Sequence, residues 1–204
     1  MAADNMTIEN LRQLLHIQTE LREQAHILNT VLMATRRTYQ HVFLNSGMPL
    51  NEQTLSFLPA HTMGEISRNF RLWMRNGMTF NNVSDRPRNP ANQADAVELE
   101  AMAYFRASPK STERFVPFTA PDGAAYYHYS TPIWMEGHCL KCHGDPAQAP
   151  ELITTRYPAA FGYKLGDLRG VISIKVPVAV VEERVMSVWR QQLVQLYQQL
   201  VDAR

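Results

Sequence analysis

The first 46 residues of the chain contain neither proline nor glycine, and a regular stripe of apolar and small residues runs through them. Members of the stripe are spaced by alternating steps of three and four residues, the period of one face of an α-helix. We therefore expect one long helix over residues 7–46, which Gly47 and Pro49 end. Such a helix could pack on its own domain alone or also pair in a dimer. The stripe comprises Leu11, Leu14, Gln18, Leu21, Ala25, Leu28, Leu32, Thr35, Tyr39 and Val42.

The remaining residues alternate between helical and strand-like spacing of apolar side chains. Strand-like stretches lie in the second half of the chain, where Pro121-Asp122-Gly123 marks the turn of a hairpin. We expect helices over 59–77, 95–107 and 178–203, strands over 114–118, 125–131 and 170–176, and a loop over 81–92.

This order of elements predicts an α+β fold, in which a small antiparallel sheet lies between long N-terminal and C-terminal helices. A chain of 204 residues that is 45% hydrophobic can form one core with helical extensions. We divide it into an N-terminal signalling or dimerisation helix at 1–46, a central domain at 47–178 and a C-terminal signalling helix at 179–204.

The two cysteines of the chain stand three positions apart, in Cys139-Leu140-Lys141-Cys142-His143. A disulfide framework is excluded, because a bridge across so short a loop cannot hold a fold together. The pattern C-x-x-C-H is that of c-type haem attachment, in which two thiols bond to the haem vinyl groups and the adjacent histidine binds the iron. The motif therefore predicts one covalently bound haem c, with His143 as an iron ligand.

Two other chemistries use similar cysteine pairs. A thioredoxin-like redox pair begins a helix after a strand, and no βαβ pattern is visible in this sequence. A zinc site could use Cys139, Cys142, His143 and His138, but the chain offers no second, distant cysteine pair. The haem interpretation alone accounts for both cysteines and the histidine beside them.

Three stretches together resemble the PAS-like c-type haem sensor domains of bacterial signal-transduction proteins. The resemblance covers about residues 35–180. It implies a PAS-like fold and a periplasmic location, in a parent protein anchored in the inner membrane and joined to a cytoplasmic output domain. The stretches are Arg88-Asn89-Pro90-Ala91-Asn92 with Asp95 and Glu98, Cys139 to Pro146, and Phe161-Gly162-Tyr163 with Gly166-Asp167 and Gly170 to Ser173.

The sequence contains no long apolar run, no signal-peptide pattern at Met1 and no kinase or cyclase motif. Because haem c attachment needs maturation on the oxidising side of a membrane, we expect a periplasmic domain excised from a longer receptor. The formal net charge of +1 gives no electrostatic reason to expect nucleic acid as a partner.

Basic and aromatic residues near the motif could line the haem. Guanidinium groups bind carboxylates in bidentate fashion, so arginines suit haem propionates. Aromatic rings can pack on the porphyrin, although rings in a strand can equally face the protein core. We expect Arg86 and Arg88 at the propionates, with Arg156 and Lys164 as alternatives, and Tyr127 and Trp134, near Tyr126 and Tyr129, at the haem face.

The group on the opposite face of the iron decides what the haem can do. A strong ligand gives a six-coordinate, redox-responsive haem, whereas a weak or absent one leaves room for a gas. Related sensors can supply this ligand from the helical region before the sheet, which here contains His61 and Met63. These two residues are two positions apart, so one helix cannot direct both at the same iron. We choose Met63, with His61 as the alternative; other candidates are His41, Met74, Met78, His128, Met135 and His138.

These expectations favour a haem-based sensor that detects redox state or a small gas such as NO, CO or O2. It would act as a homodimer and relay the signal through its flanking helices. The alternative is an electron-transfer c-type cytochrome. An enzyme is not expected, because the spacing of His61 and Arg68 does not support the acid-base pair of a peroxidase.

Overall fold

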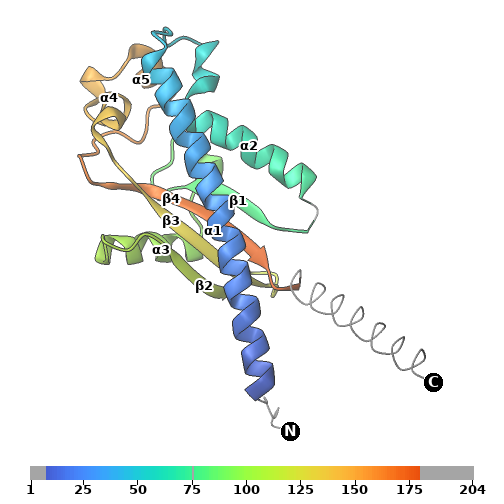
Figure 1. Cartoon of the computed structure of the whole chain (residues 1–204). Helices are drawn as coiled ribbons and strands as arrows, with labels where there is room; N and C mark the ends of the chain where they lie inside the picture. Colours follow the sequence, from blue (N-terminus) through green and yellow to red (C-terminus); the bar gives the residue numbers. More distant parts are fainter. Residues whose placement is uncertain (1–7, 75, 180–204) are drawn as a thin grey trace, which may run out of the picture.

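The computed structural model describes residues 8–74 and 76–179, and a four-stranded antiparallel sheet of order β1-β4-β3-β2 lies at its centre (Figure 1). The strands are β1 (Thr79–Val83), β2 (Arg114–Thr119), β3 (Ala125–Trp134) and β4 (Leu168–Pro177). The α-helices are α1 (Ile8–Asn45), α2 (Pro59–Trp73), α3 (Ala96–Ala107), α4 (Leu140–His143) and α5 (Glu151–Arg156). Short 3-10 turns are η1 (Thr54–Phe57), η2 (Pro90–Asn92), η3 (Gly137–Cys139) and η4 (Pro146–Gln148).

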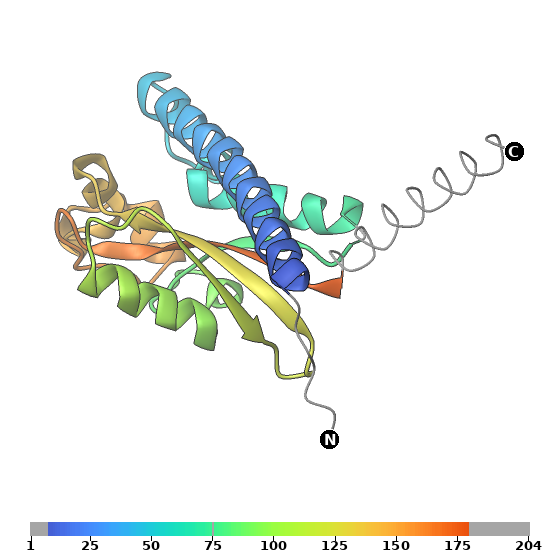
Figure 2. The same cartoon turned by 60° about the horizontal axis from the view of Figure 1, so that its bottom comes forward.

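One face of the sheet is covered by α1 and α2, as Figures 1 and 2 show. Alternate residues of a strand point to the same face, so Ile172 and Ile174 of β4 both turn toward these helices. They share one buried core cluster with Leu21 and Leu32 of α1 and Met63 of α2. The expected helix over 7–46 is therefore present as α1, and it packs on its own domain.

The apolar stripe of α1 divides between the core and the solvent. Leu21, Ala25 and Leu32 are buried, whereas Tyr39 and Val42 near the C-terminal end are exposed. The stripe thus packs against the domain along the middle third of the helix, and its residues near the C-terminal end of the helix lie in solvent.

The opposite face of the sheet is covered by α3 (Figure 2). A capping box begins this helix: the Asp95 side chain accepts from the Glu98 amide, and the Glu98 side chain accepts from the Asp95 amide. Met102 and Phe105 are fully buried against Val171 of the sheet. The helix expected over 95–107 is confirmed, with Asp95 as its N-cap.

Strand β1 was not expected, because residues 81–92 were assigned to a loop. Asn81 and Asn82 are poor strand formers, yet they pair with Ser173 and Ile172 at the free edge of β4. Buried Phe80 anchors the strand in the core below α1. Pairing with β4, which is distant in sequence, outweighs the weak strand propensity of these residues. A local sequence pattern cannot predict such a pairing.

Two of the expected helices differ from the structure in their bounds or lie beyond what it describes. Helix α2 stops at Trp73, before Gly77, whose φ of +79° suits glycine. The expected helix over 178–203 lies almost entirely outside the described residues. Within residues 8–74 and 76–179, no helix is both long and apolar enough to cross a membrane.

Candidate functional site

The cysteine motif lies in the connection between β3 and β4, at the end of the sheet nearest the C-terminal end of α1 (Figure 1). Backbone hydrogen bonds join the two ends of this connection. The Met135 amide donates to the Asp167 carbonyl at 2.8 Å, and the Gly166 amide donates to the Met135 carbonyl at 2.9 Å. Between these ties, the motif forms η3 and α4, so both cysteines and His143 stand on one short, anchored helical segment.

The imidazole of His143 is fixed by the loop that precedes β4. Its Nδ1 lies 3.0 Å from the carbonyl oxygen of Ala160, which can only accept a hydrogen bond. Nδ1 therefore carries the proton, and Nε2 keeps its lone pair for a metal. Ala160 is the non-glycine residue with positive φ among the described residues, at +63°. This left-handed backbone costs free energy and is the strain expected where a loop must orient a functional group.

The same surroundings keep His143 neutral. Burial lowers the pKa of His143 to about 3, and the nearby charges of Arg88, Arg169 and Arg36 add to the effect. The edge of its ring faces Tyr163, with centroids 6.1 Å apart. A neutral imidazole with one oriented nitrogen is what a metal ligand requires.

Both cysteines are free thiols and half-buried. The Cys139 sulfur lies 3.3 Å from Nε2 of His138. Burial raises the pKa of the Cys142 thiol, while the charges of Arg88 and Lys141 oppose that rise. Beside the motif, an open hollow of about 440 Å³ is lined by Gly137, Leu140, Lys141, Gln148 and Pro150.

The chain leaves the motif through Gly144. A Cβ atom at this position would lie 2.6 Å from the Leu140 carbonyl oxygen, so only glycine lets the backbone turn here without moving α4. The turn carries the chain back alongside the loop before β4, where the Gly162 amide donates to the Gly144 carbonyl at 2.8 Å.

The structure brings both expected propionate partners to the motif. The Arg88 guanidinium donates to the carbonyl oxygen of Cys142, and its carbon lies 4.9 Å from the ring centre of Phe161. Burial lowers the pKa of Arg88 to about 10. Arg86 lies 4.2 Å above the ring of Tyr163, the tyrosine that faces His143. Of the two alternatives, Arg156 is paired with Glu52 at the surface, and Lys164 is exposed.

Two further arginines near the motif were not anticipated. Arg36 of α1 lies within electrostatic range of Cys139 and Glu136, and burial lowers its pKa. Arg169 at the start of β4 donates to Ser84 at 2.7 Å and lies 5.4 Å from the ring of Tyr163. Arg36 precedes the motif by about a hundred residues and occupies an ordinary polar position of a helix, so no local signal marks it.

The structure does not bring Tyr127 to the motif. Its ring stacks on Phe115 at 5.0 Å, on the α1 face and toward the other end of β3. Trp134 is adjacent to the motif in sequence, but its partly buried side chain packs against the core cluster that contains Met102 and Phe105 of α3. For Tyr127 and Trp134, the structure therefore matches the alternative stated from the sequence, in which aromatic rings of a strand pack on the protein core.

The two leading candidates for the opposite iron ligand lie in different surroundings. Met63 is buried in the core cluster between α1, α2 and the sheet, to which the motif does not belong. His61 is linked toward the motif by a chain of contacts: its Nε2 is 2.5 Å from the Tyr157 hydroxyl, and the Tyr157 ring lies 5.8 Å from the Arg88 guanidinium. Among the other candidates, Met135 packs against Cys139, whereas His128 lies on the α3 face of the sheet.

Taken together, the residues present fit a c-type haem. Two thiols and a histidine with a free Nε2 stand on one short segment, and guanidinium groups lie around it. Within the described part of the chain, no group of three or more His, Cys, Asp or Glu side chains is placed to hold a metal ion.

The profile of one known family, Tll0287-like, matches residues 12–177, which is most of the chain. The chain belongs to the Tll0287-like family. The match confirms the family-level resemblance that the three sequence stretches indicated. No curated protein matches the chain.

Among solved structures, the Tll0287-like chain is similar to one described as the crystal structure of the cyanobacterial heme-protein Tll0287. The sequences are 24% identical, the TM-score is 0.56, and the match covers 74% of this chain and 95% of the other. At this identity, the likeness concerns the fold. It confirms the α+β, PAS-like sheet with flanking helices for this Tll0287-like chain.

Proposed function

We propose that this chain is a periplasmic haem-based sensor domain, which binds one haem c through Cys139 and Cys142 and coordinates its iron with His143. The observation that carries the proposal is the hydrogen bond from His143 Nδ1 to the Ala160 carbonyl, which leaves Nε2 free beside two thiols. When bound, haem supplies a redox-active iron that can also take up NO, CO or O2.

The residues around the motif have separate tasks in this proposal. Ala160 orients His143, and Gly144 lets the chain leave the short helix that carries it. Arg88 and Arg86 bring positive charge to the site, which suits haem propionates and favours the reduced, less positive iron.

Sensing requires that a change at the haem reaches the rest of the chain. Gln40 of α1 hydrogen-bonds His138, which in turn contacts Cys139, and Arg36 lies one turn earlier on the same helix. A shift of the motif therefore acts directly on a helix of 38 residues. This contact favours a sensor over an electron-transfer cytochrome, which needs no such connection.

The proposed function is tested by producing the chain in a bacterial periplasm with a c-type maturation system. We expect one haem per chain that resists extraction with acidic acetone and gives the pyridine haemochrome spectrum of thioether-linked haem. A protein without haem, or with haem that the acetone removes, would overturn the assignment. Absorption of the holoprotein then shows whether the haem is reduced or binds NO. A sensor should also change the far-ultraviolet circular dichroism of its helices under these conditions, whereas the helices of an electron carrier should stay unchanged.

We expect His61 to be the sixth iron ligand, since contacts through Tyr157 and Arg88 link it to Cys142, whereas Met63 is buried in the core cluster beside the sheet. His61→Ala should shift the Soret band and change the reduction potential, while Met63→Leu should leave both as in the wild type. Absorption spectroscopy and redox titration of the two holoproteins provide the measurement. A shifted spectrum in Met63→Leu with an unchanged one in His61→Ala would return the assignment to Met63.

A further inference from the structure

The outward face of α1 carries an apolar stripe that nothing in the described structure covers. Ile27 and Val31 are 60% and 57% exposed, and the exposed residues Ala34 and Thr38 continue the line at helical spacing. Single exposed apolar residues are ordinary, but a line of them along one helix face indicates a packing surface. This stripe lies on the opposite side of the helix from Leu21, Ala25 and Leu32, which pack on the sheet.

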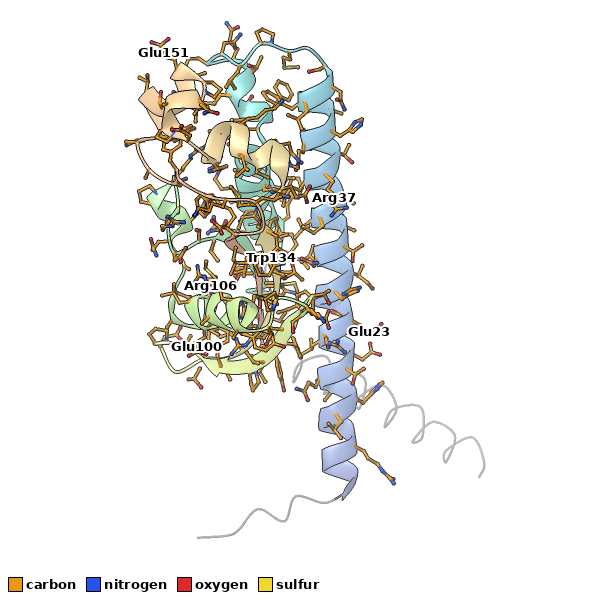
Figure 3. The ribbon with its side chains drawn as sticks, turned by 90° about the vertical axis from the view of Figure 1, so that its left-hand side faces the viewer. Glu23, Arg37, Glu100, Arg106, Trp134 and Glu151 are labelled. Atoms are coloured by element: carbon orange, nitrogen blue, oxygen red, sulfur yellow. The ribbon has the colours of Figure 1, made fainter. Side chains whose placement is uncertain are left out.

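Charged residues flank the stripe with opposite signs at its two ends. Glu20 and Glu23 lie near its N-terminal end, and Arg37 and His41 lie near its C-terminal end; all four are exposed. Figure 3 shows Glu23 and Arg37 on α1, the helix that stands along one side of the body. Glu20, Glu23 and Arg37 form no ion pair with any side chain in residues 8–74 and 76–179. The acidic end and the basic end of the stripe are thus both available to a partner.

This charge order selects the direction of a second α1 helix. In a parallel pair, each residue faces its own copy, so Glu20 and Glu23 meet carboxylates while Arg37 meets Arg37, and like charges repel. In an antiparallel pair centred between Thr30 and Val31, the acidic end of each helix faces the basic end of the other. Ile27 then lies opposite Ala34 of the partner, and Glu20 lies opposite its His41.

We propose that a second copy of this chain packs antiparallel on the outward face of α1, with Ile27, Val31 and Ala34 at the centre of the interface. The pair follows from exposure and charge alone, so it is independent of haem binding. In this antiparallel pair, the N-terminal ends of the two α1 helices, at Ile8, lie at opposite ends of the interface.

The first test measures the oligomeric state of the holoprotein by sedimentation velocity over a concentration series. Ile27→Glu buries an unpaired carboxylate in the proposed interface, so we expect the dissociation constant of the dimer to rise about a hundredfold or more. Leu165→Glu, on a side chain that is 71% exposed elsewhere, is the control and should dimerise like the wild type. A monomeric wild type, or a dimer that Ile27→Glu leaves intact, would overturn the proposal.

The second test reads the direction of the pair. Glu20 and His41 are separated by about 31 Å along one helix, given a rise of about 1.5 Å per residue. Under mild oxidation, Glu20→Cys and His41→Cys proteins should form a mixed disulfide when combined, and neither should cross-link efficiently with itself. Self-linked dimers of each variant would establish a parallel pair and contradict the proposal. The haem spectrum of the same samples reports separately on the proposed function.

Discussion

Gly170→Ala is expected to destabilise the protein by about 3 kcal/mol, toward the upper end of what overpacking costs. A Cβ atom at this position would lie 2.2 Å from the Val83 carbonyl oxygen and 3.4 Å from Cβ of Ser84. The Val83 oxygen belongs to the backbone where β1 ends beside β4, so no rotation of a side chain can relieve the clash. The strands must separate locally.

The separation would reach beyond the sheet. Ser84 accepts a hydrogen bond from Arg169 and donates one to the Arg169 carbonyl at 2.7 Å, and Val83 packs with Val171 in the core under α3. Arg169 is one of the charges that act on His143. Loss of stability should therefore be accompanied by a change in the surroundings of the candidate haem site.

Urea unfolding of the holoprotein, followed by far-ultraviolet circular dichroism, measures the effect. Gly64→Ala is the matched control: a Cβ at Gly64 meets nothing within 4 Å, and Gly64 lies in α2. Alanine there should stabilise the protein by roughly 0.5–1 kcal/mol, since glycine is a poor helix residue. Equal midpoints for Gly170→Ala and the wild type would show that β1 can move away from β4 at little cost.

Sequence patterns predicted those parts of the molecule whose signal is local. The proline-free run of α1, the turn at Asp122 and the helical spacing over 95–107 each act on their immediate neighbours, and each element is present where it was expected. The cysteine motif is also local, because its chemistry requires two thiols and a histidine within five residues.

The parts that were missed depend on contacts between distant segments. β1 forms because β4 offers a free edge, not because Asn81 or Asn82 favours a strand. Arg36 reaches the motif only because α1 crosses the end of the sheet near Cys139. Tyr127 was expected at the haem because it is close in sequence, but the strand direction carries it toward Phe115.

Lowering the pH from 6.5 to 4 is expected to cost the protein about 3 kcal/mol of stability through His128 alone, from its change in pKa. This histidine is fully buried between the sheet and α3. Burial lowers the pKa of His128 to about 4, and the charges of Lys175 and Arg114 add to the effect while Asp95 opposes it.

The hydrogen bonds of the ring explain why it resists a second proton. Nε2 lies 3.0 Å from the Ser173 hydroxyl, which donates to Glu98 at 2.7 Å and so can accept from Nε2. Nδ1 is buried, and no hydrogen-bond partner for it is found in the described part of the chain. A proton on Nδ1 would be a buried donor without an acceptor, beside two positive side chains.

The sign of the effect follows from the two protonation states. Between pH 6.5 and 4, the unfolded chain binds a proton at this position that the folded protein does not, so stability falls as the pH falls and levels off below about pH 4. His128→Gln removes the titrating group and should reduce the slope of unfolding free energy against pH by about one proton in this range. His16→Gln, the same replacement at an exposed position of α1, is the matched control. Identical slopes for His128→Gln and the wild type, measured by urea unfolding at each pH, would mean that His128 gains its proton without opening the α3 face.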